Sequence, residues 1–341
     1  MNNISLVGID LAKNIFQLHG IDKQRKTIIK KKINRANLMD IIRNINPCKI
    51  AMEACAGSNY WGRIFRSMGH EVMLISPQHV KPFVRGNKND ANDAQGIVTA
   101  AMQDGMPSVP IKSLEQQDIQ LIHRRREELV RRRTALTNQA RGFLTEYGIV
   151  MRQGMTFFTK EIPEILENAG NELTQIAREE IYEIYQEVLH LIRLISQYDK
   201  KLENICLRNE NCKRLMKLKG IGPLTASLLV VKIGDAKNFK NGRHFAAFVG
   251  LVPKEHSSGG KQCLMGISKR GDITLRNLLI NGGRSVAKIS DKKITPLNSW
   301  VNRIKQDRGF NKACVAIANK NARHAWAIMY YGEEYKYQLA S

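Results

Sequence analysis

Four acidic residues in the N-terminal part of the chain stand where carboxylates can share metal ions. Asp10 ends the apolar run in VGIDLAK, and Glu53 ends a second one in IAMEA. Asp90 and Asp93 lie in KNDANDAQ, and their spacing of three places both on one face of a helix. Carboxylates gathered in one place repel each other unless cations neutralise them, and two Mg²⁺ or Mn²⁺ ions about 4 Å apart commonly serve phosphoryl transfer. We therefore expect these four residues to bind Mg²⁺ (or Mn²⁺).

Each of these acids has a simpler explanation when it is considered alone. Asp93 suits the positive end of a helix dipole, Asp10 suits a turn after a strand, and Glu53 suits a solvent-facing strand end. The order of the four, with an acid after each of two apolar strands and then an acid pair at a helix start, favours a shared metal site.

The loop GLVPKEHSSGGKQ, residues 250–262, is the second candidate for chemistry. Ser257 and Ser258 precede two glycines and Lys261, and His256 stands just before them. The loop matches neither the GxxxxGK[ST] pattern of a P-loop nor the GxSxG pattern of a hydrolase. A nucleophilic serine needs a base, a metal or neighbouring cations for activation, and His256 is one possible base. Since Ser–Ser–Gly–Gly is also ordinary turn sequence, the residues alone leave both interpretations open.

Two basic segments with glycines flank this loop in the sequence. LKGIGPLTASLLV (218–230) has the form of a helix–hairpin–helix, whose glycines let backbone N–H groups approach a phosphate. A plain helix–helix corner is the alternative. GISKRGDITLRNLLI (266–280) places a basic turn and a helix directly after the loop. The predicted nucleic-acid contacts are Lys217, Lys219, Gly220, Gly222, Lys261, Lys269, Arg270 and Arg276.

The charge of the whole chain indicates a polyanionic partner. Its 341 residues include 54 Lys and Arg against 31 Asp and Glu, which gives a net charge of +23. An excess of this size favours nucleic acid over a membrane surface, because the sequence has no basic amphipathic anchor or lipidation motif. The chain also has no apolar run of the ~18–20 residues that cross a bilayer and no signal-peptide pattern, so we expect a cytoplasmic protein without a membrane partner. Six scattered cysteines without a CxxC pair predict buried free thiols.

The elements that must position the acids read as an α/β domain. Apolar or alternating runs predict strands at 4–10, 14–21, 26–33, 49–53 and 70–76, and helices at 35–45 and 60–69. Three strands followed by helix, strand, helix and strand is the element order of a ribonuclease-H-like mixed sheet. Strands one and four are neighbours in such a sheet, so the ends that carry Asp10 and Glu53 should meet.

The rest of the chain is predicted to be helical. Ile181, Val188, Ile195 and Leu202 recur at a spacing of seven, and a second row is offset from it by three. This pattern predicts a coiled-coil or helical-hairpin contact, with an ordinary intramolecular bundle as the alternative. Helices are also predicted near 273–288, 296–307 and 311–331. We expect three domains: an acidic metal-binding domain at 1–111, a helical coiled-coil region for oligomerisation and nucleic-acid binding at 112–210, and a mainly helical domain with the hairpin and serine loop at 211–341.

At GIDLAK, AMEA and NDANDAQ, the sequence resembles the RuvC-like DEDD domain of transposases of insertion sequence family 110, relatives of the Piv-type DNA invertases. The blocks GLVPKEHSSGGK, GISKRGD and LRNLL resemble the C-terminal transposase domain of that family. The resemblance implies that Asp10, Glu53, Asp90 and Asp93 are the metal-binding tetrad and that Ser258 is the nucleophile. It also implies a structured non-coding guide RNA.

We therefore expect a DNA transposase or recombinase that cleaves and rejoins DNA through a transient phosphoserine. Homo-oligomers (dimer or tetramer) would bring the acids of one subunit to the serine of another, and the enzyme would act at the prokaryotic nucleoid. The alternatives are a Holliday-junction-type endonuclease that uses water, and a non-enzymatic nucleic-acid-binding protein, which the acid tetrad argues against.

Overall fold

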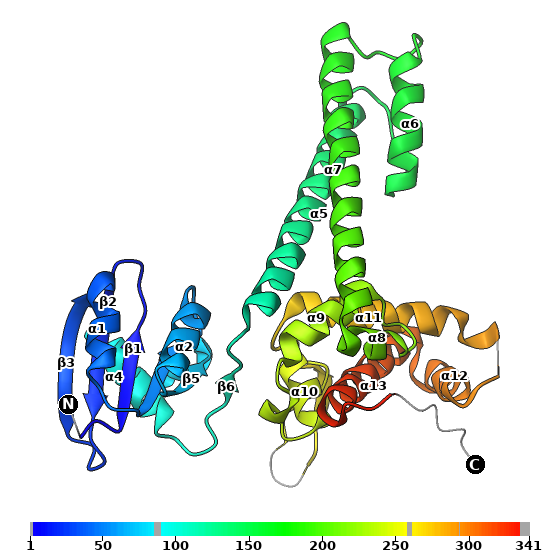
Figure 1. The fold of residues 1–341 in the computed structure, drawn as a ribbon. Coiled ribbons are helices and arrows are strands. Elements are labelled where there is room, and N and C mark those ends of the chain that lie inside the picture. Colours follow the sequence, from blue (N-terminus) through cyan, green and yellow to red (C-terminus); the bar gives the residue numbers. More distant parts are fainter. Residues whose placement is uncertain (1–2, 85–89, 258–260, 293, 335–341) are drawn as a thin grey trace. The chain divides into compact units, whose positions relative to one another are not determined.

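The computed structural model describes residues 3–84, 90–257, 261–292 and 294–334. The chain forms two compact units, Met1–Glu115 and Gln116–Ser341, which are described separately (Figure 1). This division is coarser than the three predicted domains, which remain a prediction. No helix in the described part of the chain has the length and apolar character needed to cross a bilayer.

The N-terminal unit is built on a six-stranded mixed sheet. Its order is β3 (Thr27–Asn34), β2 (Ile15–Ile21), β1 (Leu6–Asp10), β4 (Lys49–Glu53), β5 (Glu71–Ile75) and β6 (Ser108–Val109). β1, β4 and β5 are parallel, whereas β2 and β6 run antiparallel to their neighbours. The five predicted strands are present, and their arrangement is consistent with a ribonuclease-H-like domain; the two-residue strand β6 was not predicted.

Helices cover both faces of this sheet because the strand residues alternate between them. Val7 and Ile9 of β1 belong to the core on one face, together with α1 (Leu38–Arg43) and α2 (Ser58–Ser67). Leu6 faces the opposite core, where α4 (Asp90–Ala101) packs through Ile97 and Val98. The short helix α3 (Pro77–Val80) also adds Val80 to this second core.

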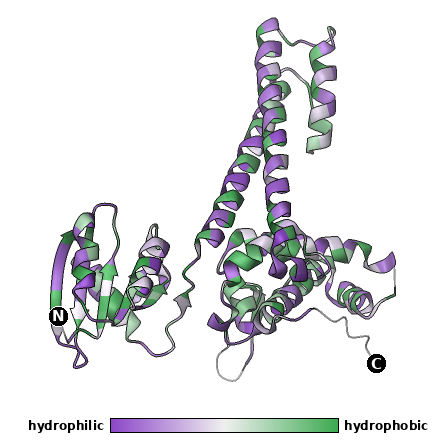
Figure 2. Cartoon of the chain, viewed as in Figure 1, coloured by the Kyte–Doolittle hydropathy of each residue, from purple (hydrophilic) through white to green (hydrophobic). Residues whose placement is uncertain are grey.

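The second unit begins with an arm of long helices. α5 (Leu114–Glu146) and α7 (Gln175–Arg208) pack together through Leu129, Leu191 and Ile195, while α6 (Met155–Glu167) packs against α7 (Figure 1). Hydrophilic and hydrophobic residues alternate along both long helices, as amphipathic helices require (Figure 2).

The row of four residues with period seven in α7 is entirely buried within the chain. The contact is therefore an intramolecular helical hairpin, which was one of the predicted forms, and pairing with a second chain remains a prediction. A separate row with a spacing of seven, which starts at Ile122 and Leu129 in α5, leaves the core at its end: Phe143 is 45% exposed, and Val150 lies beyond the helix and is 85% exposed. A helix has 3.6 residues per turn, so a strict repeat of seven drifts out of a straight contact.

The remaining helices pack below the arm around two hydrophobic cores. These helices are α8 (Glu210–Met216), α9 (Pro223–Ile233), α10 (Gly242–Val249), α11 (Ile273–Ile289), α12 (Pro296–Arg308) and α13 (Phe310–Tyr331). The three helices predicted at the C-terminal end are confirmed within two residues. Between α10 and α11, β7 (Pro253–Glu255) and β8 (Leu264–Ile267) form a two-stranded antiparallel sheet. All six cysteines are free thiols, as predicted, but only Cys206, Cys212 and Cys314 are buried; Cys48 and Cys55 are half-buried and Cys263 is exposed.

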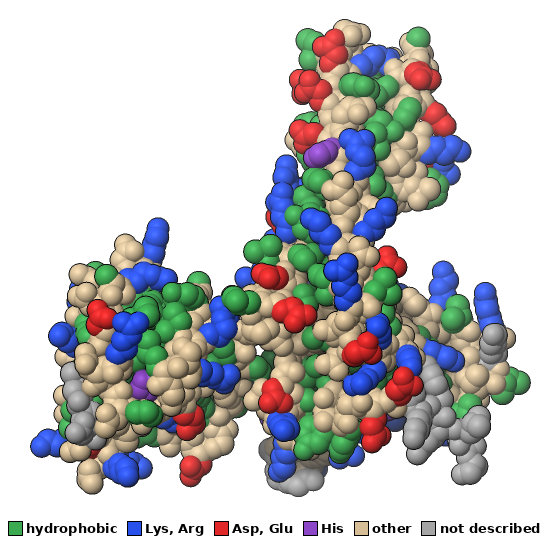
Figure 3. Space-filling view, in the orientation of Figure 1, with side chains coloured by type: hydrophobic (Ala, Val, Ile, Leu, Met, Phe, Trp, Pro, Cys, Tyr) green, Lys and Arg blue, Asp and Glu red, His purple; other side chains and the backbone are tan. Residues whose placement is uncertain are grey.

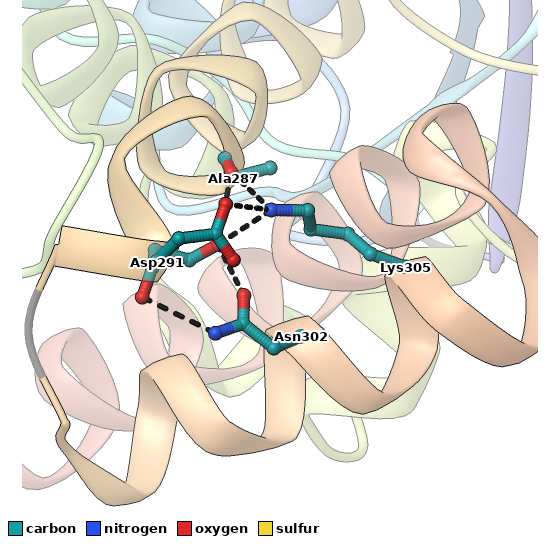
Figure 4. A network of polar contacts seen from close by, with 5 residues as sticks. Ala287, Asp291, Asn302 and Lys305 are labelled. Carbon is teal, nitrogen blue, oxygen red and sulfur yellow. Dashed lines mark hydrogen bonds and ion pairs between the residues drawn. The ribbon is translucent and has the colours of Figure 1, made fainter.

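A polar network fixes the corner between α11 and α12 (Figure 4). Lys305 Nζ donates to the Asp291 carboxylate at 2.6 Å and to the Ala287 carbonyl at 3.4 Å, while Asn302 Nδ2 donates to the Ser290 carbonyl at 3.3 Å. A cation at the C-terminal end of a helix satisfies carbonyls that lack a partner in the helix. The α11 end is thereby tied to α12.

Candidate active site

Asp10 and Glu53 end two neighbouring parallel strands at the same edge of the sheet. In the pairing of β1 with β4, Ile9 lies opposite Met52, so the residues that follow them emerge side by side. Both side chains are half-buried. The carboxyl ends of parallel strands are where α/β sheets commonly place binding groups. The predicted meeting of these two acids is therefore present in the fold.

Gly8 allows α4 to lie close to β1 and so brings Asp93 to this edge. A Cβ atom at Gly8 would stand 2.6 Å from the Ala94 carbonyl oxygen and 2.6 Å from Val98 Cγ2. These distances are too short for any side chain, so only glycine permits this contact. Asp90 begins α4, but its side chain lies outside the described residues.

The electrostatics of Glu53 and Cys55 show that the acids act on one another. Burial raises the pKa of the Glu53 carboxyl, and the charge of Asp93 raises it further. The pKa of the Cys55 thiol is also raised, first by burial and then by the charges of Glu53 and Asp10. Three carboxylates from β1, β4 and α4 thus share one electrostatic environment. A cation there would relieve the repulsion that raises these pKa values.

The donor set fits a hard divalent cation. Carboxylate oxygens are the ligands that Mg²⁺ and Mn²⁺ prefer. Among the described side chains, no three His, Cys, Asp or Glu lie close enough together to hold one ion. Asp10, Glu53 and Asp93 therefore do not form a complete set of ligands by themselves, and the side chain of Asp90, the fourth predicted ligand, lies outside the described residues.

Cys55 is a neighbour of the acids that the sequence did not reveal as part of the site. It lies two residues after Glu53, and its half-buried thiol hydrogen-bonds to the Ala56 carbonyl at 3.6 Å. Its raised pKa keeps the thiol protonated and therefore a poor ligand for a hard cation. Only the short spacing from Glu53 could have indicated this position.

The serine loop extends from the β7–β8 sheet, and its base is held by polar contacts. The Ser257 hydroxyl donates to Glu255 Oε1 at 2.6 Å and accepts from the Cys263 backbone N–H at 3.3 Å. The His256 backbone N–H donates to the Cys263 carbonyl at 3.0 Å. Ser258, the predicted nucleophile, lies outside the described residues.

The basic turn after the loop packs on a glycine corner. Lys269 adopts a positive φ of 55°, and its N–H donates to the Gly250 carbonyl at 3.2 Å. A Cβ at Gly250 would stand 2.1 Å from the Arg270 carbonyl oxygen, so glycine is required there. The side chains of Lys261, Lys269 and Arg270 are exposed, as contact with a phosphate requires.

Arg276 differs from the other predicted contacts because it is buried. It is 6% exposed, and its Nη1 donates to the Val249 carbonyl at 3.1 Å and to the Arg270 carbonyl at 2.9 Å. Its guanidinium therefore supports the basic turn from inside, whereas the sequence predicted Arg276 as a direct contact to nucleic acid.

The predicted hairpin is a turn at 217–222 between α8 and α9. Gly220 has a φ of +85° and packs on α11, since its Cβ would stand 2.6 Å from the Gly282 carbonyl oxygen. Gly222 precedes α9 and has open space around it. Lys219 is exposed, and exposed Lys217 forms an ion pair with Glu334. The close-contact role thus belongs to packing at Gly220, and the accessible glycine is Gly222.

Comparisons with known proteins match both parts of the chain. The family model of a DEDD transposase domain of the IS110 type matches residues 7–149, and the model "Transposase IS116/IS110/IS902 family" matches residues 212–296. The transposase for insertion sequence element IS1111A of Coxiella burnetii is 42% identical over 98% of this chain and 92% of its own length. The chain belongs to the IS116/IS110/IS902 family of transposases.

Other relatives agree with this assignment. A probable family 20 transposase of Pseudomonas aeruginosa is 42% identical over 96% of this chain and 97% of its own length. A pilin gene-inverting protein of Moraxella bovis is 22% identical over 92% of this chain and 91% of its own length. This transposase is thus an enzyme of a class that cleaves and rejoins DNA, and its matched DEDD domain implies a divalent metal.

Proposed function

We propose that this transposase moves an insertion sequence by site-specific cleavage and rejoining of DNA, with a metal-binding acid tetrad and a serine nucleophile. The observation that carries the proposal is the meeting of Asp10 and Glu53 on adjacent parallel strands, with Asp93 brought to them by α4. We assign Asp90, which begins the same helix, as the fourth ligand.

The reaction assigned to Ser258 conserves the phosphodiester bond. The Ser258 oxygen attacks the scissile phosphorus, the bond from phosphorus to a deoxyribose oxygen breaks, and the serine proton passes to the departing hydroxyl. A hydroxyl of the second DNA end then attacks the phosphoserine and releases the serine with its proton. Bound Mg²⁺ (or Mn²⁺) would polarise the scissile phosphate and neutralise charge that develops on it.

We assign the nucleophile to Ser258, as the resemblance to the C-terminal transposase domain implies, and a structural role in the loop to Ser257. The Ser257 hydroxyl already binds Glu255 and Cys263. Exposed Lys261, Lys269 and Arg270 supply cations for the DNA phosphates. Lys219 and Gly222 of the hairpin turn are the further phosphate contacts that we propose.

We further propose a homo-oligomer, a dimer or tetramer, in which the acids of one subunit serve the serine loop of another. A structured non-coding RNA would guide the choice of DNA, and the net charge of +23 suits both nucleic acids. The enzyme would work in the cytoplasm, at the nucleoid. Sequencing the nucleic acid that co-purifies with the transposase from cells tests the RNA partner.

The decisive experiment uses labelled element-end DNA and Mg²⁺ with three variants. Ser258→Ala should abolish both strand joining and the covalent protein–DNA adduct, whereas Ser257→Ala should retain both. Asp10→Ala should abolish cleavage. Recombination by Ser258→Ala without any adduct would instead identify a metal-dependent endonuclease that uses water. Full activity of Asp10→Ala would contradict both enzymatic mechanisms.

A further inference from the structure

A shallow cavity lies at the base of the arm, where the last turns of α7 face α5. It has a volume of about 300 Å³, the lower end of the ~300–1,000 Å³ that is usual for small-ligand sites. Its lining is Ile122 of α5 and Lys201, Asn204, Ile205 and Arg208 of α7. None of these residues was predicted individually as a contact, but all of them lie in the region 112–210 that the sequence predicts to bind nucleic acid.

The side chains of this cavity come from one helical face and combine three kinds of chemistry. Positions 201, 204, 205 and 208 are spaced by three and four, so they share one face of α7. Ile122 and Ile205 are half-buried and form an aliphatic floor, while Lys201, Asn204 and Arg208 are exposed around it.

The two cations are available to a ligand. Lys201 Nζ stands 4.8 Å from the centre of the Tyr198 ring, which orients the ammonium without neutralising its charge. Among the described residues, neither Lys201 nor Arg208 forms an ion pair with an acid. In contrast, Arg126 on the neighbouring turn of α5 is paired with Asp199.

We propose that this cavity binds one unpaired nucleotide of an RNA. The aliphatic floor can contact the flat face of a base, the Asn204 carboxamide can hydrogen-bond to a base edge with both a donor and an acceptor, and Lys201 and Arg208 can donate to the flanking phosphates. Duplexes keep their bases stacked, whereas RNA loops and bulges expose them. A cavity that holds a single base is therefore expected to bind unpaired RNA more tightly than duplex RNA.

The surroundings of the cavity agree with a polyanionic partner. The lower and middle parts of the arm show many Lys and Arg side chains, whereas Asp and Glu side chains gather at its tip (Figure 3). Arg124 and Arg131 are exposed on α5 beyond Ile122, as are Arg125 and Arg132, which form ion pairs with Glu128. A strand whose nucleotide enters the cavity could continue along these arginines.

This inference rests on the RNA partner of the proposed function, and it can be tested without catalysis. Binding of fluorescein-labelled single-stranded oligoadenylate RNA is measured by anisotropy for the full chain. The double variant Lys201→Ala/Arg208→Ala should weaken binding about tenfold. It should also reduce the salt slope by about 1.4, because two phosphate contacts are lost. Lys160→Ala, which removes an exposed cation from α6, is the matched control and should change little.

A second variant separates base binding from general attraction. Ile205→Asn keeps the charge of the protein but makes the floor of the cavity polar. It should therefore weaken the binding of single-stranded RNA and leave the binding of duplex RNA unchanged. The inference would be overturned if Ile205→Asn lost as much affinity for duplex RNA as for single-stranded RNA. It would also be overturned if the double variant lost no more affinity for single-stranded RNA than Lys160→Ala does. If the cavity variants weakened the binding of single-stranded DNA of the same length more than that of RNA, the cavity would be reassigned to DNA.

Measuring strand joining of DNA by the wild-type protein and the same variants separates a failure of the cavity proposal from a failure of the proposed function. If the wild-type protein joins DNA and the cavity variants bind RNA as tightly as the wild type does, only the proposed role of the cavity is contradicted. If the wild-type protein binds no RNA at all, the proposed guide RNA is contradicted as well.

Discussion

The Ser257 hydroxyl oxygen lies 2.6 Å from Oε1 of Glu255. The same oxygen accepts a hydrogen bond from the N–H of Cys263, so it joins the two strands at the base of the loop. Ser257 is thereby engaged in the architecture of the loop, and the chemistry is proposed for its neighbour Ser258.

Replacing Ser257 by Ala should slow strand joining only about threefold to tenfold. The variant loses hydrogen bonds worth about 0.5–1.5 kcal/mol that position the loop, but it retains Ser258. The rate of adduct formation on element-end DNA measures the effect. Glu255→Gln, which can still accept from the hydroxyl, should be affected less. An adduct lost in Ser257→Ala but kept in Ser258→Ala would reverse the assignment of the two serines.

Divalent metal should stabilise the N-terminal unit against unfolding. The raised pKa of Glu53 reflects burial and the charge of Asp93, and a bound cation would relieve that repulsion. At Mg²⁺ or Mn²⁺ concentrations well above Kd, we expect the melting temperature to rise by roughly 5 °C or more, by calorimetry. Asp10→Asn should remove the rise, and Asp104→Asn, at an exposed acid of the same unit, should keep it. A similar rise in both variants would place the metal elsewhere.

Gly282→Ala should destabilise the second unit by about 2–3 kcal/mol. The added methyl group would stand 2.0 Å from the Gly220 carbonyl oxygen, so α11 and the hairpin turn would have to separate. Urea unfolding measures the loss. Gly222→Ala, with open space around it, should cost less than about 1 kcal/mol. Equal losses at the two glycines would show that the turn does not pack as described.

His123 should make stability depend on pH below neutrality. Ser227 Oγ donates to the Pro223 carbonyl at 2.7 Å, so His123 Nε2, 2.9 Å from that oxygen, is the donor in their hydrogen bond. Burial, followed by the charges of Arg126 and Lys232, lowers the pKa of His123 to about 4.

Because the folded pKa lies below the unfolded one, the contribution of His123 is complete above pH 6.5 and is lost as the pH falls toward 4. The loss is about 3 kcal/mol. His123→Gln keeps a donor for Ser227 and should reduce the difference in unfolding free energy between pH 7 and pH 4 by about that amount. His190→Gln, at an exposed histidine of the same arm, should leave the pH dependence unchanged.

Local patterns in the sequence were sufficient for the five main strands and for the acid pair on the sheet, but not for the short strands β6, β7 and β8. Alternation and β-branched content identified five strands, and parallel β1 and β4 then placed Asp10 beside Glu53. The buried side of α7 also followed from its period of seven. Whether that side meets the same chain or another does not follow, because both contacts bury identical residues.

Residues whose roles depend on distant neighbours were not predictable in the same way. A glycine that contacts a phosphate and a glycine that contacts another helix look alike, and only the contact of Gly220 with Gly282 distinguishes them. Arg276 looked like one more cation of a basic segment, but the fold places the Val249 carbonyl, 27 residues away in sequence, within its reach.

Residue types and their local spacing can be read directly from the chain: carboxylates at strand ends, hydroxyls before two glycines, and a large excess of positive charge. These follow from chemistry and from the periods of helix and strand. The folded structure was needed to show that Ser257 binds its own loop, that Arg276 is buried and that a cavity lies between α5 and α7. Such properties depend on contacts between segments far apart in the chain, and no local pattern encodes them.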